Sequence, residues 1–316
     1  MSKKFPTFLS KIDALDKSFV KKYKSSTNVR RNVVVFAIIA NIIVTVEHSL
    51  QALTFMLTKD CDNNSTGLEY YFKKHFHYIF DFFPYNTAFA FILLLANWIG
   101  AYIWNYGDVF IIAMSMILTA RFHEIREKIC IYTSAMPTSD KKFSKPLSND
   151  LQKTNFMFWK EIRRDYIMMS ELCRKLNDLI SDVILFDFAS NLSFILFQLF
   201  AGLSHKEKFA KILYFYFSFG YVVLRICLLS IFGGWLYEAG RASLPILNAV
   251  PTEIYNIEIT RLIHQMHYNT PCFTGNNFFA VTKGLTLSVA AAVITYELVL
   301  IQFSPDIHAD DHSTCL

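Results

Sequence analysis

Long runs of apolar residues, separated by polar loops, dominate this chain. A hydrocarbon core ~30 Å thick requires ~20 apolar residues of α-helix at ~1.5 Å per residue. Five stretches reach that length, and they comprise residues 33–57, 87–120, 183–203, 212–237 and 284–303. The second stretch would be ~51 Å long as a helix, so we expect one helix that continues from the bilayer into water. The pattern predicts an all-α, polytopic membrane protein with five spans.

The composition agrees with that class and excludes several others. Of 316 residues, 53% are hydrophobic and 18% are charged, whereas a typical soluble domain has ~25% charged residues. Six cysteines are too few for a disulfide-stabilised secreted scaffold. Residues 1–32 carry nine Lys or Arg and lack the apolar segment of a cleaved signal peptide. The net charge of +5 arises mostly beside the apolar stretches, so it indicates a membrane surface and predicts no nucleic-acid partner.

The distribution of Lys and Arg predicts the orientation in the membrane. Residues 1–32 include nine basic and two acidic residues, and the loop 121–181 includes twelve basic and eight acidic residues. The loop 58–86 has three basic and four acidic residues, and the tail 304–316 has three acidic and no basic ones. We therefore expect a cytoplasmic N-terminal basic segment, a membrane domain over 33–303 and an extracellular C-terminal tail. The three lysines of the turn 204–211 oppose this orientation.

One further feature of the predicted outer loop agrees with that orientation. Residues 63–66 read Asn-Asn-Ser-Thr and contain two overlapping N-glycosylation sequons, at Asn63 and Asn64. Cys61 and Cys315 are the two cysteines expected outside, and a bridge between them is left open.

Two segments of the polar loops are expected to be helices. Between residues 151 and 181, apolar side chains recur every three or four residues and define one face, at Phe156, Trp159, Ile162, Tyr166, Met169, Leu172, Leu176 and Leu179. We favour a cytoplasmic continuation of a span over a helix lying on the membrane surface. A second helix is expected over residues 251–269, with Pro251 at its start.

The sequence lacks the motifs that carry catalysis or bind a cofactor. No P-loop, dinucleotide-binding glycine motif, nucleophile elbow or zinc-protease motif is present. The histidine pairs His75 and His77, and His264 and His267, lack accompanying ligands at suitable spacing. We therefore predict a protein that is not an enzyme and has no cofactor and no metal.

Ionisable residues within the predicted spans need a reason, because each costs ~2.5–3.5 kcal/mol on insertion scales. Asp187 is expected ~6–8 Å from the inner boundary, and Arg225, on the antiparallel neighbour, ~10 Å from it. These matching depths predict a structural ion pair between Asp187 and Arg225. Asp108 lies nearer the inner end and is also expected to be structural.

A second polar group is expected in the outer half of the membrane. It contains Glu47, Asn97, Gln198, Tyr216 and Glu297, with His48 and Trp98 adjacent in sequence to the first two. Carboxylate and amide groups flanked by aromatic faces suit a small polyol ligand in an apolar cavity. Hydrogen bonding between helices without a ligand is the alternative. Glu47, His48, Asn97 and Trp98 are the expected ligand-binding residues.

The last span contains a specific string, residues 295–303, in which Thr295-Tyr296 precedes five residues and Gln302-Phe303. This string resembles the signature of the insect gustatory receptor family. Further stretches resemble its sugar-receptor branch, namely residues 46–48, 104–111, 120–122 and 275–279. The resemblance runs from about residue 30 to residue 303.

The resemblance implies a ligand-gated cation channel of the plasma membrane of sensory dendrites. It implies a homo- or heterotetramer of related subunits, with Gln302 and Phe303 at the gate of a shared pore and the helices near 151–181 and 251–269 as an anchoring hub. Family members have seven spans, and five are counted here, so the first two are expected to be missing.

The leading hypothesis is therefore a sugar receptor subunit for sweet taste. A truncated, non-conducting or dominant-negative subunit and a G-protein-coupled receptor are the alternatives.

Overall fold

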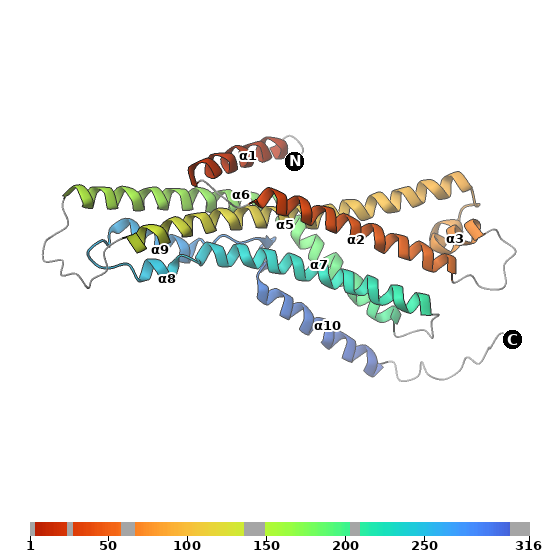
Figure 1. Cartoon of the computed structure of the whole chain (residues 1–316). Helices are drawn as coiled ribbons and strands as arrows, with labels where there is room; N and C mark the ends of the chain where they lie inside the picture. The colour runs from red at the N-terminus through yellow and green to blue at the C-terminus, as the bar shows by residue number, and fades with distance from the viewer. Residues whose placement is uncertain (1–3, 24–27, 58–66, 136–148, 203–208, 304–316) are drawn as a thin grey trace. The chain divides into compact units, whose positions relative to one another are not determined.

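The computed structural model describes residues 4–23, 28–57, 67–135, 149–202 and 209–303, and nearly all of them are helical (Figure 1). The glycosylation sequons at Asn63 and Asn64, together with Cys61 and Cys315, lie outside the described residues. The helices and strands in chain order are α1 Lys4–Tyr23, α2 Val29–Leu57, α3 Gly67–His75, α4 His77–Phe80, α5 Thr87–Ala135, α6 Asn149–Gly202, α7 Phe209–Arg241, α8 Leu244–Asn248, α9 Ile257–Tyr268, β1 Thr274–Gly275, β2 Phe279–Ala280 and α10 Lys283–Phe303.

Four of the described helices are long and apolar enough to cross a membrane, namely α2, α5, α6 and α7. They coincide with the first four predicted spans over the described residues. The fifth predicted span, residues 284–303, coincides with α10, a helix of 21 residues. Helix α5 is continuous over 49 residues, as the length of the second apolar stretch predicts. The prediction of a helical membrane fold is confirmed.

Helix α6 joins a polar half and an apolar half in one element of 54 residues. The helix expected over 151–181 is therefore the continuation of the third span. Trp159 and Ile162 are fully buried, and Tyr166 is 1% exposed, so the predicted apolar face packs inward. Phe156 is 37% exposed, whereas the polar Asn155 is 4% exposed, so Phe156 is not part of the buried face.

The segment between α7 and α10 differs from the prediction. Helix α9 begins at Ile257, not at Pro251, because Asn256 is extended and its side chain accepts hydrogen bonds from the Glu258 and Ile259 backbone N–H groups. Strands β1 and β2 form a small antiparallel hairpin after α9. Asn276 and Asn277 have positive φ angles of 44° and 61°, which asparagine tolerates in tight turns.

Several elements of the structure are absent from the sequence-based expectation. Helix α1 occupies most of the N-terminal basic segment, and α3 and α4 occupy the loop after the first span. Tyr71, Phe72, Phe76 and Ala90 form a small buried cluster that joins α3 to the start of α5. Short polar sequences between spans thus fold because their aromatic residues find an apolar partner.

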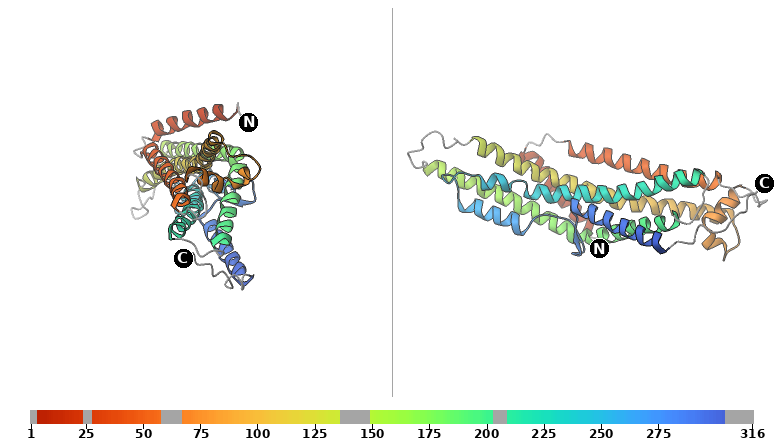
Figure 2. Two further views of the ribbon diagram at one scale, coloured as in Figure 1. Left: turned by 90° about the vertical axis from the view of Figure 1, so that its right-hand side faces the viewer. Right: turned by 90° about the horizontal axis from the view of Figure 1, so that it is seen from below.

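The chain divides into two compact units. Unit 1 contains residues 1–33, 111–185 and 229–283, and unit 2 contains residues 34–110, 186–228 and 284–316. Unit 2 holds the apolar parts of the spans, and unit 1 holds the polar halves of α5 and α6 together with α1, α8 and α9. Within unit 1, α9 runs alongside the first half of α6 (Figures 1 and 2).

Buried contacts hold helix α1 against the rest of unit 1. Phe19 is 1% exposed, and Asp165 of α6, 2% exposed, accepts hydrogen bonds from Lys22 at 2.5 Å and Tyr23 at 2.6 Å. Partial burial disfavours the charge of Lys22, but the hydrogen bonds to Asp165 and Glu161 outweigh it and raise its pKa above 10.5. Arg121 of α5 contacts Asp16 at 3.0 Å.

The segment containing α9 is held on α6 by polar contacts along its length. The Asn155 side-chain N–H donates to the Ile254 carbonyl at 2.8 Å, and the Trp159 indole N–H donates to the Asn155 oxygen at 2.8 Å. Arg163 donates to the Glu258 carboxylate at 2.6 Å. Further along, the Asn177 side-chain oxygen accepts the Thr274 N–H at 2.7 Å. These contacts fix the segment between α7 and α10 against α6.

Replacing Asp165 with Asn should release α1. The buried amide would leave Lys22 and Tyr23 without their charged acceptor, which costs about 1–3 kcal/mol. We expect faster tryptic cleavage near Lys21 and Lys22 and faster hydrogen exchange in α1. Asp13→Asn is the control, because the Asp13–Lys17 pair is exposed on the same helix and such pairs contribute little. Equal protection of α1 in both variants would contradict this docking.

Acidification should weaken the contact between α6 and α9. Burial alone would raise the pKa of Glu258, but the hydrogen bonds and charges of Arg163 and Arg261 lower it below its ordinary value of 4.5. A lowered pKa means that the unfolded state binds more protons, so this stabilisation is present above pH 4.5 and is lost as the pH falls further. Thermal unfolding measured from pH 6 to pH 3.5 should show this loss, and Glu258→Gln should flatten it. An unchanged pH profile in the variant would exclude Glu258 as its source.

Candidate functional site

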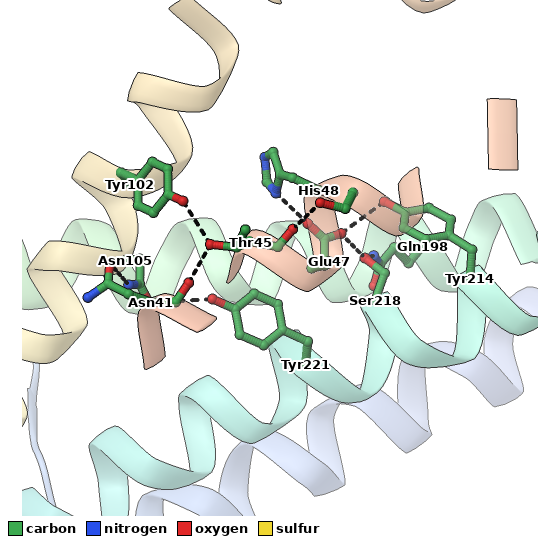
Figure 3. A network of polar contacts seen from close by, with 11 residues as sticks. Asn41, Thr45, Glu47, His48, Tyr102, Asn105, Gln198, Tyr214, Ser218 and Tyr221 are labelled. Carbon is green, nitrogen blue, oxygen red and sulfur yellow. Dashed lines mark hydrogen bonds and ion pairs between the residues drawn. The ribbon is translucent and has the colours of Figure 1, made fainter. Parts of the chain in front are cut away.

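A buried carboxylate in unit 2 joins α2 to α7. Glu47 of α2 is 7% exposed and accepts hydrogen bonds from the Tyr214 hydroxyl at 2.9 Å and the Ser218 hydroxyl at 3.0 Å, both on α7. The Nδ1 atom of His48 lies 2.6 Å from the other carboxylate oxygen. Figure 3 shows the three groups converging on Glu47. A buried carboxylate requires such donors, because an unpaired one is costly.

The network extends from Glu47 to α6 and α5. The Gln198 amide of α6 donates to the Ser218 hydroxyl at 2.9 Å, and the Gln198 carbonyl oxygen is buried without a hydrogen-bond partner among the described residues. Trp98 of α5 packs edge-on against the His48 ring with centroids 5.6 Å apart. Segments of four helices therefore meet around Glu47 within unit 2, and the Gln198 carbonyl oxygen has no hydrogen-bond partner among the described residues.

Further polar contacts lie next to this network (Figure 3). Thr45 of α2 and Tyr102 of α5 share a hydrogen bond of 2.8 Å. Asn105 of α5 donates to the Asn41 side chain at 3.5 Å and accepts from the Tyr221 hydroxyl at 3.4 Å. These are the contacts that join α2, α5 and α7 between Glu47 and the charged cluster described next.

Arg225 of α7 lies near two carboxylates, those of Asp108 and Asp187. Its Nε atom donates to Asp108 at 2.5 Å, whereas its Nη2 atom lies 3.8 Å from Asp187, beyond hydrogen-bond range. The Trp104 indole N–H donates to Asp187 at 3.1 Å, and the guanidinium lies over the Trp104 ring, 4.3 Å from its centroid. The predicted partners Asp187 and Arg225 are therefore brought together, but the closer partner is Asp108. The cluster carries one carboxylate more than it has guanidinium groups.

The residues that build this site share helical spacing. On α7 they follow intervals of four, three and four residues, and on α5 intervals of four, three and three, namely Tyr214, Ser218, Tyr221 and Arg225, and Trp98, Tyr102, Asn105 and Asp108. Such intervals place side chains on one face of a helix. This spacing is the sequence signal that could have identified the site. The depth of a residue along its helix does not distinguish Tyr214 from Tyr216, and it led to the choice of Tyr216, which is 67% exposed.

The other predicted site residues lie apart from this network. Asn97 is half-buried beside Trp98 and takes no part in the hydrogen bonds described above. Thr295 bonds to its own helix at the Ala291 carbonyl, and Tyr296 and Glu297 are half-buried on α10. Gln302 is exposed in the last turn of α10, which ends at Phe303.

One histidine of each pair considered as metal ligands is packed against an aromatic ring. His75 stacks on Tyr71 with centroids 5.5 Å apart, and His264 lies 4.3 Å from the Tyr268 ring. Across the described part of the chain, no three His, Cys, Asp or Glu side chains come close enough together to hold a metal ion.

Helix α10 differs from the other spans in its lack of burial. None of its described side chains is buried, although the helix is composed mainly of apolar residues. Its faces are therefore free to contact lipid or further protein.

Comparisons with known proteins give consistent matches. A family model described as trehalose receptor matches residues 1–315. The gustatory receptor for sugar taste 64f of Drosophila melanogaster is 30% identical over 251 residues, 78% of this chain and 49% of that one. The gustatory receptor 5a for trehalose of the same species is 27% identical over 276 residues, 87% of this chain and 58% of that one. The chain thus spans between 49% and 58% of the length of these two relatives.

A solved structure has a similar fold. The insect olfactory receptor OR5 from Machilis hrabei, in complex with eugenol, aligns with a TM-score of 0.58 at 13% identity. The alignment covers 90% of this chain and 70% of that chain. This likeness extends to the fold and not to the ligand.

Neutralising the two carboxylates around Arg225 should have unequal effects. Asp187→Asn removes the excess charge and should be tolerated, whereas Asp108→Asn removes the closer partner of Arg225 and should reduce thermal stability more. The double variant leaves a buried guanidinium without a carboxylate, at a cost of about 3–5 kcal/mol. Thermal stability of the detergent-solubilised chain measures this order. Adding Arg225→Gln to the double variant is the control and should restore stability. A larger loss for Asp187→Asn than for Asp108→Asn would contradict the pairing.

Proposed function

This chain belongs to the trehalose receptor family of insect gustatory receptors, and we propose that it acts as a subunit of a sugar-gated cation channel in the perception of sweet taste. The proposal places the chain in the plasma membrane of sensory neurons, within a homo- or heterotetramer of related subunits. Its N-terminal segment faces the cytoplasm, and Asn63 or Asn64 is glycosylated outside, as the charge asymmetry supports.

The Glu47 network is the observation that carries this proposal. Sugars are recognised by groups that bond to several hydroxyls beside aromatic faces. Glu47, His48 and Gln198 supply polar atoms in an apolar environment, and Trp98 supplies a ring beside them. The open Gln198 oxygen can accept a bond from a sugar hydroxyl. We therefore keep Glu47, His48 and Trp98 as ligand-binding residues, with Asn97 at the edge of the site.

A sugar that bonds to Glu47 competes with Tyr214 and Ser218, which hold α2 to α7. A ligand shifts a conformational equilibrium only if it binds one state more tightly than the other. Exchange of the helix-to-helix hydrogen bonds for bonds to the sugar provides that difference. Binding therefore favours a state in which α7 is less tightly held to α2.

The pore is assigned to α10. Its unburied, apolar faces suit contacts with neighbouring subunits, and Gln302 and Phe303 lie in its last turn, where the gate is proposed. Helix α10 begins at Lys283, whose ammonium group contacts Glu238 of α7 at 2.6 Å. Within unit 1, α7 is thus attached directly to the start of the proposed pore helix.

The two tyrosines at the start of α7 provide a matched test of the sugar site. Tyr214→Phe removes a hydroxyl that bonds to Glu47, and Tyr216→Phe removes one that is exposed outside the network. Loss of a hydrogen bond to a charged group corresponds to about 1.5–3 kcal/mol, or at least a tenfold change. We expect Tyr214→Phe, which frees Glu47 for the sugar, to lower the half-maximal trehalose concentration of cation currents at least tenfold. Glu47→Gln, which removes the charged acceptor, should raise it at least tenfold, and Tyr216→Phe should leave it unchanged.

Variants of the proposed gate separate binding from conduction. Gln302→Ala and Phe303→Ala should change the resting current or ion selectivity while the half-maximal sugar concentration stays close to that of the parent. Currents identical to those of the parent would remove Gln302 and Phe303 from the gate. Assembly at the cell surface without any sugar-evoked current would instead identify a non-conducting subunit and overturn the channel proposal.

A further inference from the structure

A cavity of about 830 Å³ lies in unit 1 beside the first half of α6. Its walls include five basic side chains and one acidic side chain, namely Lys128, Lys153, Lys160, Arg163, Arg164 and Glu161. Lys128 belongs to α5, and the others lie on α6 at spacings that place them along one side of the helix. The cavity is distinct from the Glu47 network, which belongs to unit 2.

The positive charge of this cavity is only partly neutralised. Glu161 lies 2.8 Å from Lys22 and 3.4 Å from Lys128, so the acid of the cavity wall is already shared by two lysines. Arg163 is paired with Glu258 at 2.6 Å. Lys153, Lys160 and Arg164 are exposed, and no ion pair joins them to any other residue that the structure describes. Three cations therefore converge on the cavity without a carboxylate partner there.

The membrane surface does not account for these three cations. Asp182 and Asp187 are the last charged residues of α6 before its apolar end, so the bilayer starts near them. Arg164 precedes Asp182 by 18 residues, which is about 27 Å along a helix. The headgroup layer on each side of a bilayer is only about 5–8 Å thick. A lipid headgroup in the membrane therefore does not reach Arg164, Lys160 or Lys153.

We propose that this cavity binds a soluble, small anion that carries two or more phosphate groups. The volume lies in the range of small-molecule sites, about 300–1,000 Å³. Arg164 can bind phosphate oxygens through two parallel N–H groups, and the two lysines act as compact point charges. The walls also include Met157, Phe158 and Ile167, which can contact the C–H face of a ring that bears the phosphates. This binding is independent of the sugar site.

Titration calorimetry on the purified, full chain in detergent tests the proposal. The probes are inositol 1,4,5-trisphosphate and inorganic tripolyphosphate. The test variant is the triple substitution Lys153→Gln, Lys160→Gln and Arg164→Gln. The control variant is Lys21→Gln, Arg126→Gln and Lys175→Gln, which removes the same charge from exposed positions that do not line the cavity. We expect at least tenfold weaker binding in the test variant and unchanged binding in the control. Binding should also weaken as KCl rises from 0.05 M to 0.3 M.

A second arm distinguishes the source of the phosphates. The chain is placed in nanodiscs of phosphatidylcholine with or without 5 mol% phosphatidylinositol 4,5-bisphosphate, and inositol 1,4,5-trisphosphate is titrated. We expect the same affinity in both, because the lipid headgroup does not reach the cavity. Lower affinity in the disc that contains the phosphoinositide would assign the site to a lipid and overturn the soluble source.

Two further results would overturn the proposal outright. Equal loss of binding in the test and control variants would indicate non-specific attraction to a basic protein. Absence of binding to the parent chain, combined with a change of oligomeric state in the test variant, would indicate that an acidic surface of another copy occupies the cavity. Size-exclusion chromatography and the helical circular dichroism signal establish that both variants remain folded.

Discussion

Unit 2, which holds the apolar parts of the spans, depends on one constraint, the cost of leaving a polar group unpaired in hydrocarbon. Each such group must find a partner within the protein, because lipid offers none. Four polar residues of α7, namely Tyr214, Ser218, Tyr221 and Arg225, meet this requirement by bonding to Glu47 on α2, Asn105 and Asp108 on α5 and, through Ser218, Gln198 on α6. The same pairing sets the rotation of each helix. A ligand that supplies alternative partners is therefore able to change how these helices are held.

Helix α7 connects this pairing to the segment that leads into α10. Its first half carries Tyr214 and Ser218, and its second half carries Glu238, which holds Lys283. Gly233 and Gly234 allow the 281–283 segment to lie directly against α7, because a methyl group at Gly233 would overlap the Val281 side chain. Within unit 1, the second half of α7 thus contacts the residues that lead directly into α10.

The length of the apolar runs predicted the spans, because crossing a membrane requires a long apolar window, and hydrophobic periodicity predicted the buried face of α6. Arithmetic of helix depth placed Glu47 at the level of Gln198, and Asp187 at the level of Arg225, and the structure brings the members of each pair into one cluster. Depth does not give rotation about the helix axis, and this is why Tyr216 was selected instead of Tyr214 and why Asp108 was missed as the nearest partner of Arg225. Helix α1 was missed because its stability comes from a distant residue, Asp165.

The positive charge of the chain has two origins that the sequence alone does not separate. Bases close to a span end follow from membrane topology, since they are favoured on the cytoplasmic side. Lys153, Lys160 and Arg164 lie about 27 Å or more from the start of the apolar half of α6, so topology does not require them. Basic side chains that repel one another around a cavity are destabilising unless something neutralises them. Their position around one cavity is therefore better explained by an anion that occupies it than by the orientation of the chain in the membrane.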